Sequence, residues 1–82
     1  MINRLEETIE LMTSPDYKDR LKAEFEQLCF RINKLDAFLD KWDKGELKIT
    51  PKSPREWFEK QRQAMADYGQ VLAARAIKEE IY

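Results

Sequence analysis

Two groups of residues in this chain have the chemistry to bind a small anionic molecule. The first is an aromatic ring with three cations, at Tyr17, Lys18, Arg20 and Lys22. These residues follow Ser14-Pro15-Asp16, which predicts the start of a helix. The free amides of a first helical turn attract anions, and a ring beside cations suits a flat, negatively charged molecule such as a nucleotide. The same segment also fits a solvated, charge-balanced helix start that binds nothing.

The second group is an amide, a phenol and a guanidinium spaced seven residues apart, at Gln61, Tyr68 and Arg75. This spacing places them in one line along a helix. We expect the line to run along the middle of a face that is otherwise apolar, formed by Phe58, Ala64, Met65, Val71, Leu72 and Ala76.

Two interpretations of this polar line stay open. Polar groups on a packing face can set the register and the number of packed helices, with Arg75 reaching solvent or pairing with an acid. Alternatively, subunits leave a polar cavity between them, in which Arg75 offers its planar fork to a phosphate. Gln61 or Tyr68 would then hold the rest of the ligand. Gly69 lies beside this line, and a glycine inside a helix predicts a close approach by a second helix or by the flat face of a ligand.

Several kinds of catalytic chemistry are missing. The chain has no histidine, so catalytic triads and zinc sites are excluded. Its only glycines are Gly45 and Gly69, so it has no glycine-rich phosphate loop. The single cysteine, Cys29, cannot form an internal disulfide, and we interpret it as a small buried hydrophobic residue. The sequence therefore predicts a protein that is not an enzyme and that has no cofactor and no metal.

Charge and hydropathy limit the partners. Fifteen basic and sixteen acidic residues leave a net charge of −1, which provides no attraction to the backbone of a long nucleic acid. No apolar run approaches the roughly 20 residues of a membrane span, and the start of the chain lacks the pattern of a signal peptide. We expect no long nucleic acid and no membrane as partners, and a cytoplasmic location.

The sequence predicts three helices, of which the first two lie within residues 2–44. Residues 2–12 place Ile2, Leu5, Ile9 and Met12 on one face, as in a short amphipathic helix that must dock on another surface. Residues 15–44 form the second helix, with Ser14 as its N-cap and Gly45 closing it. Its apolar residues recur at steps of four and three, the seam of a helix that packs along its whole length: Leu21, Phe25, Leu28, Ile32, Leu35, Leu39 and Trp42.

A loop at residues 45–53 leads to the third helix, residues 54–81, which should open with a capping box of Ser53 and Glu56. We predict an all-α single domain over residues 1–82, in which the second and third helices form a long antiparallel hairpin. The apolar face of the third helix, with Trp57 and Val71 beside Phe58 and Leu72, is too broad for one partner helix. We therefore expect a homo-oligomer.

Several stretches of the chain resemble a family of small phage proteins of unassigned function first noted in crAss-like phages. They are YKDRLKAEFEQLCFR from Tyr17, KLDAFL, the loop containing ITPKSP, and QAMADYGQVLAARA. More remotely, the third helix, with Trp57, Met65, Gly69 and Arg75-Ala76-Ile77, looks like the hairpin helix of phage nucleotide sponges that counter CBASS and Thoeris immunity.

The second resemblance implies helical hairpins that assemble into hexamers in the host bacterial cytoplasm. Such proteins sequester cyclic oligonucleotides or cyclic ADP-ribose derivatives without cleaving them. Of the residues above, Arg75 and Tyr17 are those the resemblance places at the ligand. Two hypotheses remain: a phage anti-defence sponge for a cyclic nucleotide signal, and a helical protein-binding module, an inhibitor or adaptor of a host protein without a small ligand. The sequence leaves open which signal, which host system and how many subunits.

Overall fold

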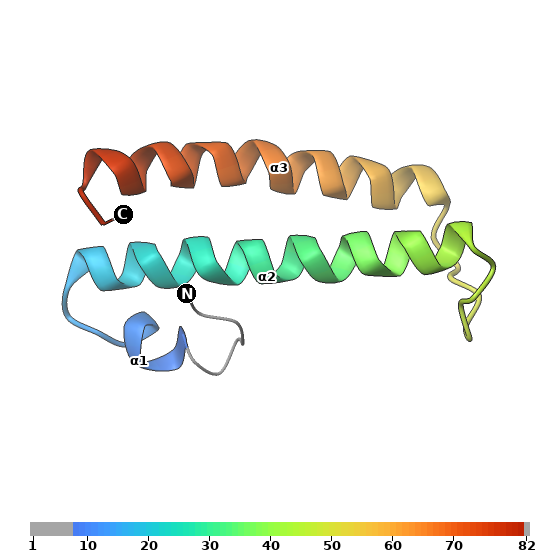
Figure 1. Cartoon of the computed structure of the whole chain (residues 1–82), viewed down its shortest axis with the longest axis horizontal. Helices are drawn as coiled ribbons and strands as arrows, with labels where there is room; N and C mark the ends of the chain where they lie inside the picture. Colours follow the sequence, from blue (N-terminus) through green and yellow to red (C-terminus); the bar gives the residue numbers. More distant parts are fainter. Residues whose placement is uncertain (1–7, 82) are drawn as a thin grey trace.

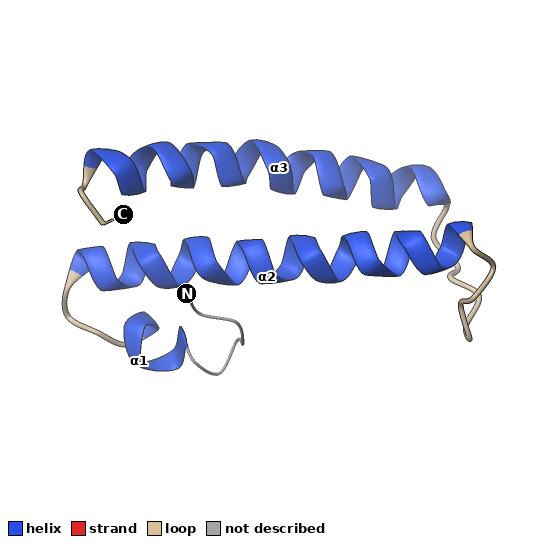
Figure 2. Ribbon diagram, viewed as in Figure 1, coloured by secondary structure: helices blue, strands red, loops and turns tan. Residues whose placement is uncertain are grey.

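The computed structural model describes residues 8–81, and all its regular elements are helices (Figure 1, Figure 2). They are α1 (Ile9–Met12), α2 (Tyr17–Asp43) and α3 (Arg55–Lys78). The long helices α2 and α3 run antiparallel and side by side, and α1 packs on α2 (Figure 1). The predicted all-α fold, a short helix followed by a long hairpin, is therefore confirmed.

The hydrophobic core lies between α2 and α3, at the end of the hairpin away from the connecting loop. Leu21 and Leu28 of α2 and Leu72 of α3 are buried there. Partly buried side chains surround them, namely Phe25, Ile32, Met65 and Ile81. The α2 residues of this core form the first part of the predicted seam, because residues at steps of four and three share one side of a helix.

A second apolar cluster lies at the loop end of the hairpin and consists of three aromatic rings. Phe38 and Trp42 of α2 both contact Phe58 of α3, with ring centroids 5.5 and 5.4 Å from it. Phe38 and Trp42 also meet edge to face, at 6.0 Å. Such geometries add to the stabilisation that comes from buried area alone.

The start of α2 differs from the prediction. Asp16, and not Ser14, is the N-cap, because the Asp16 carboxylate accepts the Lys18 amide at 2.9 Å. The Ser14 hydroxyl instead accepts the Asp16 amide and donates to the Asp19 carboxylate, at 3.1 and 2.8 Å. Pro15 therefore precedes the helix, which begins at Tyr17.

The end of α2 confirms the role predicted for Gly45. The amide of Gly45 donates to the Trp42 carbonyl, and that of Glu46 donates to the Lys41 carbonyl, at 3.0 and 2.9 Å. This pair of bonds needs a left-handed residue at Gly45, whose φ is +70°. Glycine takes that conformation without strain.

Both ends of α3 also differ from the prediction. Pro54 is the N-cap and no side chain caps the helix, so the capping box of Ser53 and Glu56 does not form. At the other end α3 stops at Lys78, because Glu80 takes a left-handed φ of 60° and the Ile81 amide turns back to the Ala76 carbonyl. This turn places the Ile81 side chain against the core. Burial of that side chain favours the end of α3 at this point.

Only part of the first predicted helix falls within the described residues. Ile2 and Leu5 lie outside them, and the helix that is described has four residues. Ile9 and Met12 are exposed, whereas Thr8 is buried and its hydroxyl accepts the Gln27 side-chain amide at 2.7 Å. The described residues of the face expected to dock on another surface are therefore largely exposed, although the Met12 sulfur accepts the Gln27 side-chain amide of α2.

Candidate functional site

The clearest contact between predicted site residues joins the two ends of the hairpin sequence. Arg75, near the end of α3, donates to the hydroxyl of Tyr17, the first residue of α2, at 2.6 Å. The guanidinium carbon also lies 5.9 Å from the centre of the Tyr17 ring. The antiparallel hairpin thus unites one residue from each predicted group, although 58 positions separate them.

The electrostatics of this contact keep Arg75 charged. Its hydrogen bond to Tyr17 is the largest cause that raises the pKa of Arg75, and the negative charges of Glu24 and Glu79 act in the same direction. Both Tyr17 and Arg75 are exposed, so the cation and the ring present one joint surface to solvent. A guanidinium held against an aromatic ring is a suitable surface for a phosphate-bearing, planar ligand.

The remaining residues of the first group have different surroundings. Arg20 donates to the Ser14 carbonyl at 2.9 Å, so its guanidinium folds back over the segment that precedes α2. Lys18 is exposed on the first turn of α2, and Lys22 is half-buried one turn further along. Within one chain, the structure therefore brings Tyr17, but not the whole group, into contact with Arg75.

The polar line of Gln61, Tyr68 and Arg75 lies on one flank of the buried face of α3. The residues that face α2 come one position later, and include Arg62, which pairs with Asp36 at 2.6 Å, and Gly69, which lies next to Leu28 and Ile32. One position corresponds to about 100° around a helix. The prediction that the line runs along the middle of the packing face is therefore wrong for the monomer.

The length of the polar line prevents its members from sharing one small ligand within a chain. Gln61 and Arg75 are fourteen positions apart, which is about 21 Å at 1.5 Å per residue. The Gln61 side-chain amide points along the helix to the Met65 sulfur, at 4.0 Å. Only Arg75 of this line meets the first group of predicted residues.

The polar line borders an uncovered apolar stripe on α3, formed by Trp57, Ala64 and Val71. All three are exposed, Trp57 to 59 % and Val71 to 57 %. They alternate with Gln61, Tyr68 and Arg75 at steps of four and three, which is the spacing of a helix-packing seam. The apolar surface of α3 is wider than α2 covers, as the sequence predicted.

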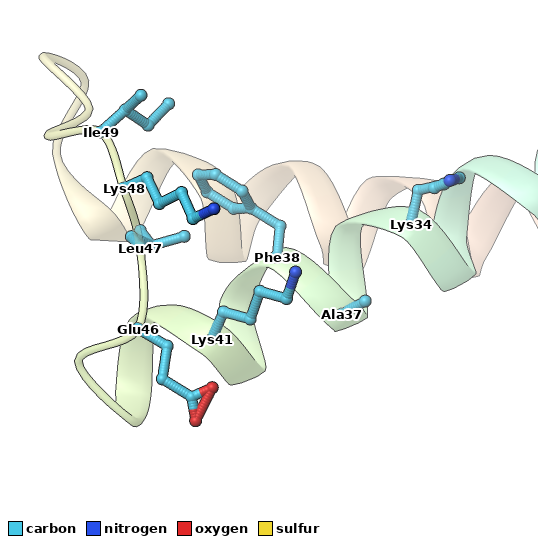
Figure 3. Close-up of a pocket in the computed structure, with 8 residues that line it drawn as sticks. All are labelled: Lys34, Ala37, Phe38, Lys41, Glu46, Leu47, Lys48 and Ile49. Carbon is cyan, nitrogen blue, oxygen red and sulfur yellow. The ribbon is translucent and has the colours of Figure 1, made fainter.

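Sequence reasoning missed a cavity at the loop end of the hairpin (Figure 3). Its volume is about 410 Å³, and it lies between residues 34–41 of α2 and residues 46–49 of the loop. The loop carries no helical or strand periodicity, so nothing in the sequence indicated that its side chains fold back on α2. The one available signal was the lysine spacing, since Lys34, Lys41 and Lys48 are seven residues apart.

Two further findings concern residues 8–81. No helix in this part of the chain is long and apolar enough to cross a membrane. Within the same residues, no three acidic or cysteine side chains come together in a group suited to a metal ion.

Comparisons with known proteins place the chain in a family. No curated protein and no solved structure matches it. A family model described as Sequestin matches residues 15–78. The match extends over the whole hairpin, from the segment before α2 to the last residue of α3, and so includes both Tyr17 and Arg75. The chain therefore belongs to the Sequestin family.

Proposed function

We propose that this protein is a phage anti-defence sponge that sequesters a small cyclic nucleotide signal and does not cleave it. Membership of the Sequestin family supports a binding and sequestering role over a catalytic one. The contact of Arg75 with Tyr17 carries the finer proposal, because it combines a fixed cation with an exposed ring at the start of a long helix. A phosphate would bind Arg75 and a base would lie against Tyr17.

Release of the ligand unchanged follows from the side chains that are present. The chain has no histidine, and among residues 8–81 the contacts given for Tyr17 and Arg75 include no nucleophile paired with a base. Glu24 and Glu79 are close enough to influence Arg75, so a bound phosphate competes with their negative charge. Additional cations at the same site would offset that competition, and Lys18 beside Tyr17 and Lys78 three residues after Arg75 are close to it along the chain.

A homo-oligomer would complete the site. The stripe of Trp57, Ala64 and Val71 has the spacing to pack against a second copy, and Arg75 continues the same seam. Such packing would cover the exposed apolar groups and enclose the surface of Arg75 and Tyr17 between subunits. Gln61 and Tyr68 of one copy would then either set the register or line the cavity. Six subunits is the number implied by the resemblance to phage sponges.

Calorimetry against cyclic dinucleotides, cyclic trinucleotides and cyclic ADP-ribose isomers tests the proposal. We expect heat with at least one compound, and recovery of that compound unchanged by chromatography after heat denaturation of the complex. Arg75→Met and Tyr17→Ala should each weaken binding at least tenfold, which corresponds to about 1.4 kcal/mol. Arg31→Met, at an exposed arginine of α2, is the matched control and should bind normally. A chemically altered product would refute the sponge.

A protein-binding module is the second candidate function, and the exposed Trp57 and Val71 favour it. In that case the stripe on α3 would bind a helix of a host protein. The ultraviolet spectrum of freshly purified protein separates the two functions. A sponge that retains nucleotide has excess absorbance at about 260 nm, whereas a protein-binding module has the spectrum of its tryptophans and tyrosines alone. Absence of heat with the whole ligand panel would favour the module.

A further inference from the structure

We propose that the cavity at the loop end of the hairpin is a second binding site, for a small molecule that joins a planar ring to a phosphate, of the nucleoside monophosphate class. The cavity lies far from Tyr17 and Arg75. Tyr17 and Lys41 are 24 positions apart on one helix, which is about 36 Å. The two sites therefore cannot share one small ligand within a chain, and this inference stands independently of the proposed function.

The size of the cavity suits such a ligand. Its volume of about 410 Å³ lies within the range of roughly 300 to 1,000 Å³ that is usual for small-molecule sites. One wall is a regular helix, α2, and the other is the loop that follows Gly45 (Figure 3). The Schellman turn at Gly45 orders the first residues of this loop, since the amides of Gly45 and Glu46 are both bonded to α2 carbonyls.

The apolar part of the cavity offers a fixed ring and an uncovered aliphatic side chain. Phe38 is held on its other sides by Trp42 and Phe58, so its orientation is set by the aromatic cluster. Ile49 is 66 % exposed in the loop, and among residues 8–81 few large apolar side chains are as uncovered. A planar ring that enters between Phe38 and Ile49 would stack on the first and remove the second from water.

The polar side chains that line the cavity are three lysines and one carboxylate, Glu46. The side chains of Lys41 and Lys48 extend toward Phe38, whereas the Glu46 carboxylate points away from it (Figure 3). Within the described part of the chain, neither Lys41 nor Lys48 forms an ion pair. The third lysine, Lys34, places its ammonium 5.4 Å from the Phe30 ring at the far edge.

Charge and shape together identify the ligand class. A phosphate monoester carries a charge of about −1.5 to −2 at neutral pH, which two ammonium groups balance. Because Phe38, Lys41 and Lys48 line the same cavity, a compact molecule that has its phosphate close to its ring suits it. An acidic peptide would place carboxylates along an extended groove, whereas this cavity is confined to about two turns of α2 and four loop residues.

Adenosine monophosphate is the probe for the test, titrated into the full chain and followed by amide chemical shifts. We expect shifts centred on residues 46–49 and saturation of the site. Lys41→Gln combined with Lys48→Gln should weaken binding at least tenfold. Lys52→Gln combined with Lys60→Gln removes the same charge from exposed lysines outside the cavity and should change the affinity less than threefold. Ile49→Ser should weaken binding at least threefold.

Three further titrations make the outcome decisive. Adenosine and inorganic phosphate should each bind at least tenfold more weakly than adenosine monophosphate. Arg75→Met should leave this affinity unchanged, even if it abolishes binding of the sequestered signal. The proposal is overturned by absence of shifts at residues 46–49, by equal weakening in the two double variants, or by equal binding of inorganic phosphate. Tighter binding of a glutamate-rich peptide would also overturn it and identify a protein-docking surface.

Discussion

At Gly69, α3 lies against α2 with space for one more methyl group. A Cβ atom at this position would lie 3.6 Å from a methyl of Leu28 and 3.9 Å from a methyl of Ile32. These distances are ordinary van der Waals contacts. The predicted close approach at this glycine is therefore made by the partner helix of the hairpin, and it does not require the absence of a side chain.

Gly69→Ala should consequently stabilise the protein by about 0.5 to 1 kcal/mol, because alanine favours the helix and fills available space. Urea denaturation followed by circular dichroism measures the change. Gly45→Ala is the contrasting variant and should destabilise by about 1 kcal/mol, since its φ of +70° strains any residue with a Cβ atom. A destabilised Gly69→Ala would mean that the two helices pack more tightly than these distances indicate.

The thiol of Cys29 should react slowly at neutral pH. Burial raises the pKa of Cys29, and the charge of Glu26 raises it further, so the thiolate that reacts is scarce. We expect alkylation by iodoacetamide at pH 7.5 to proceed several-fold more slowly in the folded protein than in urea. Equal rates in the two conditions would show that the thiol is accessible and unperturbed.

At the scale of the elements, one ion pair fastens the end of α2 to the start of α3. Arg55 donates two hydrogen bonds to the Asp43 carboxylate, at 2.7 and 3.3 Å, and its guanidinium lies 5.3 Å from the Trp42 ring. This contact stands at the helix start where the predicted capping box is absent. The loop of residues 44–54 is thus closed by side chains from the two helices that it connects.

This ion pair should make stability depend on pH on the acid side. The hydrogen bond from Arg55 is the main cause that lowers the pKa of Asp43 below its ordinary value near 3.8. The contribution is therefore complete above that ordinary value and is lost as the pH falls through the lower, folded pKa. Thermal unfolding from pH 6 to pH 2 should show a smaller loss of stability in Asp43→Asn than in the wild type.

High salt provides the control for that measurement, because Asp43 is largely exposed and its attraction to Arg55 is screened. In about 1 M sodium chloride the two acid profiles should converge. Profiles that are parallel at both salt concentrations would place the acid sensitivity in other carboxylates.

At the scale of the whole molecule, the hairpin presents an apolar stripe that its own chain does not cover. Trp57, Ala64 and Val71 are exposed along α3, on a different side from the buried Leu72 and Ala76. An amphipathic helix normally has one apolar side. Two such sides on α3 indicate one partner inside the chain and one outside it, which is the basis of the proposed oligomer.

Val71→Glu should therefore dissociate the protein into folded monomers at micromolar concentration, since it places a charge in the proposed contact between copies. Sedimentation equilibrium measures the mass, and circular dichroism checks that the hairpin remains helical. Gln70→Glu adds the same side chain on another side of α3 and should leave the mass unchanged. A wild-type protein that sediments as a monomer would remove the oligomer from the proposal.

The sequence by itself determined the elements and their pairing. Leu21 and Leu28 of α2, and Met65 and Leu72 of α3, are each seven residues apart, which is a helical spacing. Burial of such residues between two long helices is the main favourable contribution to folding. Gly45 ended α2 as predicted, because the left-handed turn there depends on a local preference of one residue. The sequence also predicted that the apolar face of α3 is wider than one partner helix can cover, since this width follows from helical periodicity alone.

Only the tertiary structure decided the details that depend on residues far apart in the chain. Ile81 leaves the helical path and packs against the core that Leu21, Leu28 and Leu72 form, residues that lie far from it in α2 or earlier in α3. The contact of Arg75 with Tyr17, and the lysine cavity over Phe38, required the register of α3 on α2 and the fold of the loop. Periodicity along one helix cannot predict the register of α3 on α2 or the conformation of the loop, because both depend on packing between segments.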